Sequence, residues 1–456
     1  MWPTNRVLVK AIACAVLFIS GIIFLYNKEL CRINKNRFLL NKDEIPINRT
    51  PDFILANSPP SNYESILFNH ENVTLLEKAN KCLKEIDVVY TWVNGSCPEF
   101  QKSKAKWLGL SDKGKGSVAA SMSARFYDWD TMRYSIRSVE TFLPCTRNLY
   151  IVTNGQVPIW LNLSNPKVNL ITHRDIFPNK SHLPTFNSNA IEQHLHLIKG
   201  LSEKFLYFND DILISKKLTL RDLYYGENGQ HIYMSDLKIS DCYPGCKIGK
   251  TGNGICNLAC NNTFCNFDGK DCLANTANIR FETTKSKGGP WKTSLAFGNG
   301  VLSEKFGVTQ RLYPEHVPQF LDKDVMAQYT KAFSRYINNT SSSKFRHGSN
   351  IPMALVYYNF IMSERDHMKD KCDKKCRFRY NIKPRKSEYF HMIGIGSNVA
   401  MVKRNLEQWY KSRRPLFVLI QDTNQGMTPD NHASHKVLRE YFERVFPRPS
   451  QFESSI

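Results

Sequence analysis

Short apolar runs alternate with amphipathic stretches along most of the chain. Four runs rich in β-branched and aromatic residues are predicted to be strands: "IDVVYTWVNG", "NLYIVTNG", "VNLITHRDIF" and "KFLYFNDDILI". Residues 125–144 have helical spacing that ends at a proline, and residues 187–201 are predicted to form a second helix. Strands that alternate with helices predict an α/β protein with a Rossmann-like mixed sheet flanked by helices.

Polar residues stand where these predicted strands end. Asn94 and Asn154 each precede a glycine, and Asp210 and Asp211 interrupt the last apolar run. An Asn-Gly pair alone is typical of an ordinary turn, but ligands of such sheets bind beyond the carboxyl ends of the strands. Several polar residues at one edge therefore predict a site.

The adjacent carboxylates Asp210 and Asp211 need a partner. Burying an unpaired carboxylate is costly, so the pair is expected to face solvent or a cation. Mg²⁺ and Mn²⁺ prefer oxygen ligands, and either ion is expected here. The alternative is that the two residues cap a following turn.

Residues 7–26 form an apolar run interrupted only by Lys10. Its length suits a helix that crosses a bilayer, and no small residues follow it as a signal-peptidase site would require. We therefore expect a transmembrane signal-anchor, with a cytosolic tail at 1–6 and a polar stem at 27–81.

The formal net charge of +21 comes from 62 basic and 41 acidic residues. No block of Lys and Arg dominates, and spread basic residues are typical of a solvated surface. We expect no nucleic-acid partner.

Cysteines and glycosylation signals indicate the compartment. The chain has 13 cysteines, six of them between Cys242 and Cys272, and eight Asn-X-Ser/Thr sequons. Clustered cysteines suit an oxidising compartment, and sequons suit the secretory lumen. A type II membrane topology with the bulk of the chain in the lumen is expected.

The cysteine cluster has the spacing C-x3-C-x9-C-x3-C-x4-C-x6-C and contains no histidine. A zinc site is disfavoured, whereas three disulfides beside oxygen ligands for calcium fit better. Residues 241–273 resemble a Notch-type LNR module. That resemblance implies disulfides Cys242–Cys265, Cys246–Cys260 and Cys256–Cys272, and calcium ligands Asn253, Asp268 and Asp271.

Four blocks resemble those of the Stealth family of hexose-1-phosphate transferases. They are "IDVVYTWVNG"; "RFYDWDTMRYSIRSVE" through "KFLYFNDD"; "HVPQFLDKDVMAQY" with "KFRHGSN"; and "VLIQDTNQG" through "RPSQFE". The resemblance implies a catalytic domain with a GT-A-like fold, in two parts at 82–240 and 274–456, separated by the LNR module.

The resemblance also implies an activity. It is the transfer of N-acetylglucosamine 1-phosphate from UDP-N-acetylglucosamine to the 6-hydroxyl of mannose, on high-mannose N-glycans of lysosomal hydrolases, with release of UMP. A homodimer in the Golgi membrane is the implied setting. Two other functions stay open: a GT-A-type glycosyltransferase that releases UDP, and a non-enzymatic, calcium-dependent binding ectodomain.

The family match assigns expected roles to individual residues. Asp210 and Asp211 would hold the metal, Glu192 and Asp422 would bind metal or orient a hydroxyl, and His347 would be the general base. For Arg125 and Arg137 the alternative is pairing with Asp128. The expected donor-binding residues are Asp87, Trp92, Asn94, Arg125, Arg137, Asn154 and Arg346.

Overall fold

The computed structural model describes residues 32–33, 86–110, 126–143, 146–224, 229–273, 281–282, 289–368, 377–411, 414–422 and 430–454. The expected cytosolic tail, the signal-anchor, the stem apart from residues 32–33, and Arg125 lie outside these residues. Within the described part of the chain, no helix is long and apolar enough to cross a membrane.

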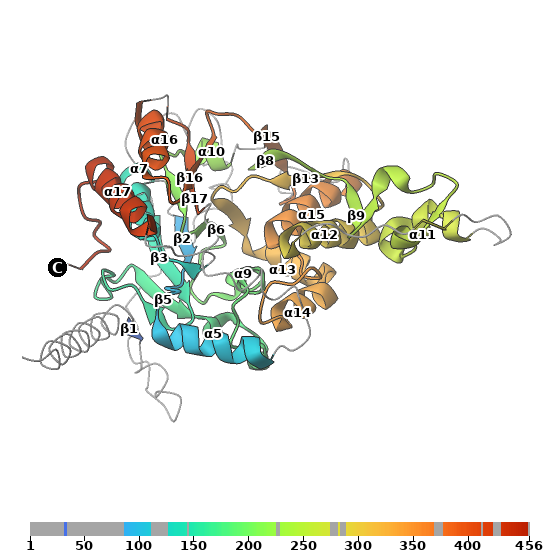
Figure 1. The fold of residues 1–456 in the computed structure, drawn as a ribbon, viewed down its shortest axis with the longest axis horizontal. Helices are drawn as coiled ribbons and strands as arrows, with labels where there is room; N and C mark the ends of the chain where they lie inside the picture. The colour runs from blue at the N-terminus through green and yellow to red at the C-terminus, as the bar shows by residue number, and fades with distance from the viewer. Residues whose placement is uncertain are drawn as a thin grey trace, which may run out of the picture.

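A five-stranded mixed sheet forms the centre of the molecule (Figure 1). β2 (Ile86–Thr91) pairs in parallel with β3 (Thr146–Thr153) and β6 (Lys204–Asn209), and β5 (Val168–Thr172) extends the sheet beside β3. β14 (Gln319–Asp322) runs antiparallel beside β6. The α/β architecture with a mixed sheet is confirmed.

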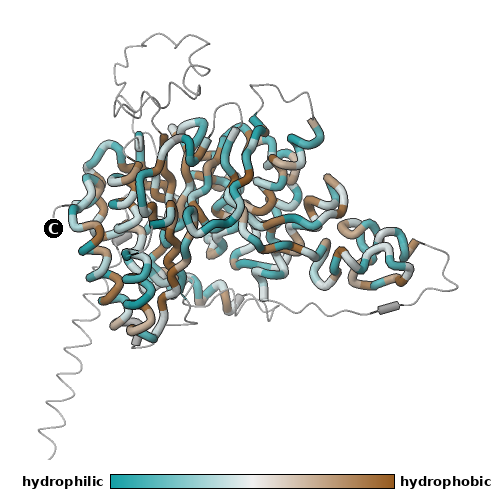
Figure 2. The backbone as a smooth tube through the Cα atoms, turned by 90° about the horizontal axis from the view of Figure 1, so that it is seen from above, coloured by the Kyte–Doolittle hydropathy of each residue, from teal (hydrophilic) through white to brown (hydrophobic). Residues whose placement is uncertain are grey.

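Alternate residues of the central strands enter two different cores. Val88 and Tyr90 of β2 pack with α7 (Thr131–Phe142), whereas Val89 packs with α15 (Met353–Met368). Both faces of the sheet are therefore covered, as its continuous apolar strands require. Figure 1 shows α7, α16 and α17 on one side of the sheet and α12, α13 and α15 on the other, and Figure 2 shows the hydrophobic stretches gathered centrally.

The helices of the described residues have the following bounds: α5 Pro98–Leu110, α8 His173–Ile176, α9 Ser188–Glu192, α10 Leu220–Leu223, α11 Asn266–Gly269, α12 Pro290–Phe306, α13 Lys323–Ala332, α14 Ser334–Ser342, α16 Val399–Lys411 and α17 Asp430–Val445.

Two other three-stranded sheets flank the centre. One has the order β16-β17-β7 and the other the order β13-β8-β15. The remaining strands are β1 Arg32–Ile33, β4 Gln156–Val157, β7 Ile212–Ile214, β8 Gln230–Ile239, β9 Asp241–Tyr243, β10 Cys246–Lys247, β11 Cys256–Asn257, β12 Phe281–Glu282, β13 Arg311–Pro314, β15 Tyr380–Pro384, β16 Phe390–Ile395 and β17 Phe417–Asp422.

Three predicted elements differ in detail. The helix expected at 125–144 begins only at Thr131, because Asp130 adopts a left-handed conformation with φ 63°. The helix expected at 187–201 ends at Glu192, where the buried Gln193 side chain instead bonds Ile351 and Tyr329. The last part of "VNLITHRDIF" is the short helix α8, which begins with a capping box of Thr172 and Asp175.

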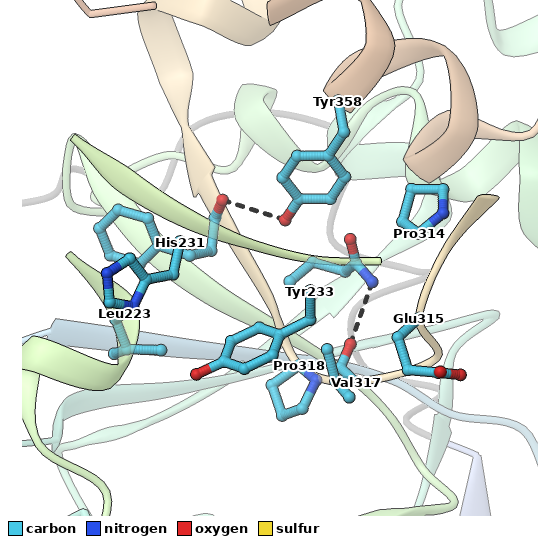
Figure 3. A pocket seen from close by; sticks show the side chains of 10 residues that line it. Leu223, His231, Tyr233, Pro314, Glu315, Val317, Pro318 and Tyr358 are labelled. Atoms are coloured by element: carbon cyan, nitrogen blue, oxygen red, sulfur yellow. Dashed lines mark hydrogen bonds between the residues drawn. The ribbon is translucent and has the colours of Figure 1, made fainter. Parts of the chain in front are cut away.

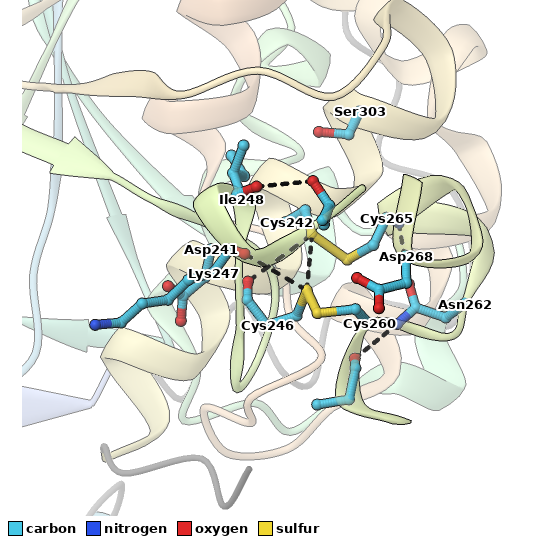
Figure 4. The surroundings of a disulfide bond; sticks show 12 residues. Asp241, Cys242, Cys246, Lys247, Ile248, Cys260, Asn262, Cys265, Asp268 and Ser303 are labelled. Atoms are coloured by element: carbon cyan, nitrogen blue, oxygen red, sulfur yellow. Dashed lines mark hydrogen bonds between the residues drawn. A yellow bond between two sulfur atoms is a disulfide. The ribbon is translucent and has the colours of Figure 1, made fainter. Parts of the chain in front are cut away.

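The LNR module extends beyond the side of the sheet that α12, α13 and α15 cover, where β9 and α11 lie in Figure 1. Its three disulfides are those that the resemblance implied: Cys242–Cys265, Cys246–Cys260 and Cys256–Cys272. Figure 4 shows the first two side by side. A module this small holds its shape through these bridges.

Candidate active site

The carboxyl ends of β2, β3 and β6 meet at one edge of the central sheet. Thr91 is in register with Val152 on one side and with Asn209 on the other. Trp92 and Asp210 follow these strands directly, so they emerge next to each other. The aspartate pair sits in a turn, because β6 ends at Asn209 and β7 begins at Ile212 in a different sheet.

Asp210 and Asp211 are half-buried, and their surroundings disfavour the negative charge of both carboxylates. Burial, together with repulsion from Asp211, raises the pKa of Asp210 to about 8. Burial raises the pKa of Asp211 to about 7, against the attraction of Arg346. Oδ1 of Asp211 is buried and has no hydrogen-bond partner within the described part of the chain. An orphaned carboxylate oxygen beside a second carboxylate suits a divalent cation.

Asp422 reaches the same place from a separate sheet. β17 runs antiparallel to β7, and the Ile420 N–H donates to the carbonyl of Asp211 at 2.9 Å. β17 ends at Asp422. The indole N–H of Trp129 donates to Asp422 Oδ2 at 3.2 Å.

Asp128 is a site residue that the sequence reasoning treated only as a pairing partner for arginine. It accepts hydrogen bonds from Trp92 Nε1 at 2.9 Å and from the Asp130 N–H at 2.8 Å. Burial, then repulsion from Asp130 and Asp210, raises its pKa to about 7. The signal was the "DWD" of residues 128–130, two carboxylates just before a helix.

Glu192 lies beyond the aspartates, at the end of α9. Tyr207 O–H donates to Glu192 Oε1 at 3.4 Å, and the Tyr207 oxygen lies 3.0 Å from Thr91 Oγ1 at the sheet edge. Burial raises the pKa of Glu192 to about 7, and the positive charge of Arg346 opposes that rise. The side chain can therefore hold or release a proton near neutral pH.

Arg346 supplies positive charge to this region. Its guanidinium donates to Ser188 Oγ at the start of α9, and its charge favours the ionised forms of Glu192 and Asp211. A guanidinium in this position can bind phosphate oxygens through paired hydrogen bonds.

His347 follows on the same loop, and its side chain is exposed. Its backbone N–H donates to Asn350 Oδ1 at 2.8 Å, and its Nδ1 lies 2.8 Å from Ser349 Oγ. The Asn350 side chain also accepts from Asn187 Nδ2 at 2.9 Å, which ties the loop to the start of α9. The role of His347 as a base stays a prediction.

Two expected donor-binding residues lie elsewhere. Asp87 is at the opposite end of β2, where it accepts from Arg147 Nε at 2.8 Å and from the Ser202 N–H at 2.7 Å. Arg137 is buried and bonds Glu453 through Nε at 2.6 Å and Nη2 at 2.9 Å, as well as Glu443. The charged groups of both side chains are occupied by structural partners, and their contact with the donor stays a prediction.

Asn94 and Asn154 both shape turns at the carboxyl edge. Asn94 Oδ1 accepts from the Ser96 N–H at 3.0 Å, and its backbone N–H donates to Gln156 Oε1 at 2.9 Å. Asn154 Oδ1 accepts from the Gln156 N–H at 3.3 Å, before Gly155 with φ 106°. Their positions agree with the predicted edge, and donor contact stays a prediction.

The LNR module offers oxygen atoms for calcium. Asp268 is fully buried; its Oδ2 accepts from Asn257 Nδ2 at 3.0 Å, and its Oδ1 has no hydrogen-bond partner among the described residues (Figure 4). Asp271 Oδ2 accepts from the Gly254 N–H at 2.8 Å, and Asn253 Oδ1 from the Ile255 N–H at 3.0 Å. The buried, unpartnered Asp268 oxygen fits a hard cation.

Two other features of the described residues do not belong to this site. Glu203, Asp322 and Asp324 lie close enough to share a cation, but Arg377 forms ion pairs with all three. The pocket in Figure 3 lies between β8, residues 314–320 and α15, and none of the site carboxylates lines it.

Comparison with known proteins gives three Stealth family models. Conserved region 1 matches residues 84–112, conserved region 2 residues 125–232 and conserved region 3 residues 315–363, and an LNR-domain model matches residues 239–273. The second region contains both Asp128 and the aspartate pair.

Three curated relatives are similar to this chain. The N-acetylglucosamine-1-phosphotransferase subunits alpha/beta are 50% identical over 159 residues in Mus musculus (35% of this chain, 13% of the relative) and 43% identical over 190 residues in Homo sapiens (40% and 15%). An exopolysaccharide phosphotransferase of Streptomyces coelicolor is 40% identical over 372 residues, which is 81% of this chain and 52% of the relative. The chain thus spans about half of the last relative and a smaller part of the first two.

A solved structure of the galactosyltransferase LgtC with donor and acceptor sugar analogues covers 79% of this chain and 96% of its own, at 11% identity and a TM-score of 0.32. The three conserved regions and the identities to the phosphotransferases show that this chain belongs to the Stealth family.

Proposed function

We propose that this chain transfers a sugar 1-phosphate from a nucleotide sugar to a hydroxyl group of a second sugar. The observation that carries the proposal is the aspartate pair Asp210 and Asp211 at the carboxyl edge of the central sheet, with an unpartnered buried oxygen and Arg346 nearby. The names of the three phosphotransferase relatives support the same class of reaction.

The name of the mouse and human relatives gives N-acetylglucosamine 1-phosphate as the transferred group, and the family resemblance implies the donor and the acceptor. The donor is UDP-N-acetylglucosamine, and the acceptor is the 6-hydroxyl of mannose on the high-mannose N-glycans of lysosomal hydrolases. The acceptor oxygen forms a bond to the phosphorus that carries N-acetylglucosamine. The bond from that phosphorus to the bridging oxygen breaks, and UMP leaves with the electron pair.

Residues of this chain prepare both reactants. Arg346 pairs with oxygens of the transferred phosphate. His347 accepts the proton of the attacking hydroxyl, and its ring is held in place by Ser349, whose N–H donates to Nδ1 at 3.2 Å and whose Oγ lies 2.8 Å from the same nitrogen. Glu192, within reach of Tyr207, orients the hydroxyl. Trp92 and the turns at Asn94 and Asn154 border the nucleotide.

The carboxylates divide into ligands and supports. Asp210 and Asp211 would hold Mg²⁺ or Mn²⁺, with Asp128 and Asp422 close behind them. Such an ion would draw charge from the diphosphate as UMP departs. Two protein carboxylates suffice, because Mg²⁺ usually completes its shell with water and substrate phosphates.

The test is the identity of the nucleotide product. The full-length protein is incubated with UDP-N-acetylglucosamine, Mn²⁺ or Mg²⁺ and α-methyl mannoside. We expect UMP and a mannoside that carries N-acetylglucosamine phosphate, and Asp211→Asn should make neither. UDP as the product would instead identify a glycosyltransferase, and an inert wild type would favour a binding ectodomain.

The cellular setting is also a proposal. The apolar run at 7–26, the sequons and the disulfides support a type II protein of the Golgi membrane with a lumenal catalytic domain. The LNR module would bind calcium through Asn253, Asp268 and Asp271. The family resemblance also implies a homodimer.

A further inference from the structure

Trp291 is an exposed tryptophan beside the candidate active site. It stands in the first turn of α12, directly after Pro290, and 39% of its surface is exposed. It is the most exposed tryptophan in the described part of the chain. A single exposed apolar side chain is ordinary on a protein surface, so what sets Trp291 apart is its contact with Tyr313.

Tyr313 connects Trp291 to the catalytic groups. The two rings meet edge to face, with centroids 6.0 Å apart and an interplanar angle of 77°, and their side chains also share a hydrogen bond. Tyr313 lies within electrostatic range of both Glu192 and Arg346. Burial, then the negative charge of Glu192, raises the pKa of Tyr313 to about 12, so its hydroxyl stays protonated and can bond a ligand.

The loop that carries Arg346 and His347 packs on the same turn of α12. A Cβ atom added to Gly348 would lie only 2.6 Å from Thr293 Cγ2, so the loop approaches this turn as closely as a glycine allows. Thr293 is two residues beyond Trp291. The loop and the indole thus share one turn of α12, and Tyr313 connects the indole to Arg346.

The chemistry of this surface suits a sugar ring. An indole offers a flat apolar face, and hexopyranosides present a face of C–H groups that can lie on it while their hydroxyl groups remain in water. A half-buried, protonated phenol and a nearby guanidinium provide the few polar groups that fix a ligand's orientation. An exposed site next to the catalytic loop also admits a large glycan.

We propose that Trp291 and Tyr313 form the acceptor subsite, in which a hexopyranoside with a free primary hydroxyl stacks on the indole and is oriented by the phenol. This inference rests on the proposed function. It adds that recognition of the acceptor sugar is separate from the aspartate pair, which serves the donor. The primary hydroxyl of the stacked sugar is thereby directed toward the loop of Arg346 and His347.

Steady-state kinetics of the full-length protein test the subsite. With UDP-N-acetylglucosamine saturating and α-methyl mannoside varied, Trp291→Ala should raise the acceptor KM by about tenfold, the loss expected when one stacked aromatic contact is removed. The donor KM should stay unchanged. Trp291→Phe keeps an aromatic face, so its acceptor KM should lie between those of wild type and Trp291→Ala.

Tyr410→Ala is the matched control, because Tyr410 is 44% exposed on α16, where its ring contacts Tyr441, Arg414 and Arg444. It should leave the acceptor KM unchanged. A Trp291→Ala protein with a normal acceptor KM, or one whose donor KM rises by the same factor, would overturn the inference.

A binding measurement separates this inference from the proposed function. Saturation-transfer NMR of α-methyl mannoside with the full-length protein detects the sugar whether or not catalysis occurs. We expect a signal with wild type that is weakened in Trp291→Ala and retained in Asp211→Asn. If no UMP forms but this pattern holds, the proposed reaction fails and the sugar subsite stands; equal signals from wild type and Trp291→Ala reject the subsite.

Discussion

Asp87 and Asp211 are acidic residues at opposite edges of one sheet, and they differ in every contact. Asp87 at the start of β2 is fully buried and bonds the Arg147 guanidinium and the N–H groups of Asn148 and Ser202. Asp211 after β6 has a buried oxygen without a partner among the described residues. The sequence predicts that both serve the reaction, but of the two only Asp211 has a buried carboxylate oxygen that remains able to bind a cation.

The comparison separates two uses of a buried carboxylate. A carboxylate that is fully hydrogen-bonded and paired with arginine serves to hold neighbouring segments of the fold together. Where it is crowded against other carboxylates and left unsatisfied, the fold is destabilised locally, and a ligand can recover that loss. The unsatisfied edge is therefore where binding is expected.

The largest expected effect is that of Asp211→Asn on turnover. Loss of one metal-binding carboxylate should lower kcat by roughly 10³-fold, as for other groups that stabilise transition-state charge. The melting temperature should not fall, because the change removes a charge that burial disfavours. Nucleotide release and differential scanning fluorimetry measure the two quantities. A variant that melts lower yet keeps its kcat would make Asp211 structural, like Asp87.

Asp87→Asn should show the reverse pattern. It weakens the ion pair to Arg147, which is 38% exposed, so we expect the free energy of unfolding to fall by about 2 kcal/mol rather than by the larger amount typical of fully buried pairs. The kcat of the protein that remains folded should be near that of wild type. Chemical denaturation and kinetics on the same sample check both points, and a kcat loss comparable to that of Asp211→Asn would contradict the comparison.

The aspartate pair also predicts that the stability of the folded protein depends on pH. The pKa values of Asp210 and Asp211, about 8 and about 7, lie above the usual range of an aspartate, so between about pH 4 and pH 8 the folded state binds more protons than the unfolded state. This pair therefore lowers the stability of the metal-free protein as pH rises through that window.

Melting temperatures of wild type and Asp211→Asn, compared at each pH, isolate this contribution. Buried histidines such as His173 and His194, whose pKa values burial lowers to about 4, act in the opposite direction but cancel in the difference. The melting temperature of Asp211→Asn should exceed that of wild type by an amount that grows from pH 5 to pH 8. This difference should vanish when Mn²⁺ is added. A difference that is independent of pH would show that Asp211 is not strained.

The sequence predicted the sheet edge well because short apolar runs and a carboxylate pair are local signals. It could not separate Asp87 from Asp211, since the partners of Asp87 on Arg147 and Ser202 come from distant segments. The same holds for Arg137, which is engaged by Glu453 from the C-terminal end of the chain. Asp128 was overlooked because the left-handed Asp130 moves it out of the predicted helix and into the site.

The smallest expected effect concerns the hydrogen bond from Trp92 Nε1 to Asp128 Oδ2. Trp92→Phe keeps a buried aromatic ring and removes the indole N–H donor. The hydrogen bond from this donor lowers the pKa of Asp128, so its loss should raise that pKa. The acidic limb of the kcat/KM profile should therefore shift to higher pH, with a loss of about threefold at pH 6.5 and less at pH 8, where Asp128 is ionised in both proteins.

Trp129→Phe provides the matched comparison for that change, because its indole donates to Asp422 rather than to Asp128. If only the Trp92 variant shifts the profile, the protonation of Asp128 controls the site. If both variants shift it equally, the carboxylates of the two sheets titrate together as one cluster. An unshifted profile in both would place Asp128 with Asp87, among the carboxylates whose charge serves the fold and not the reaction.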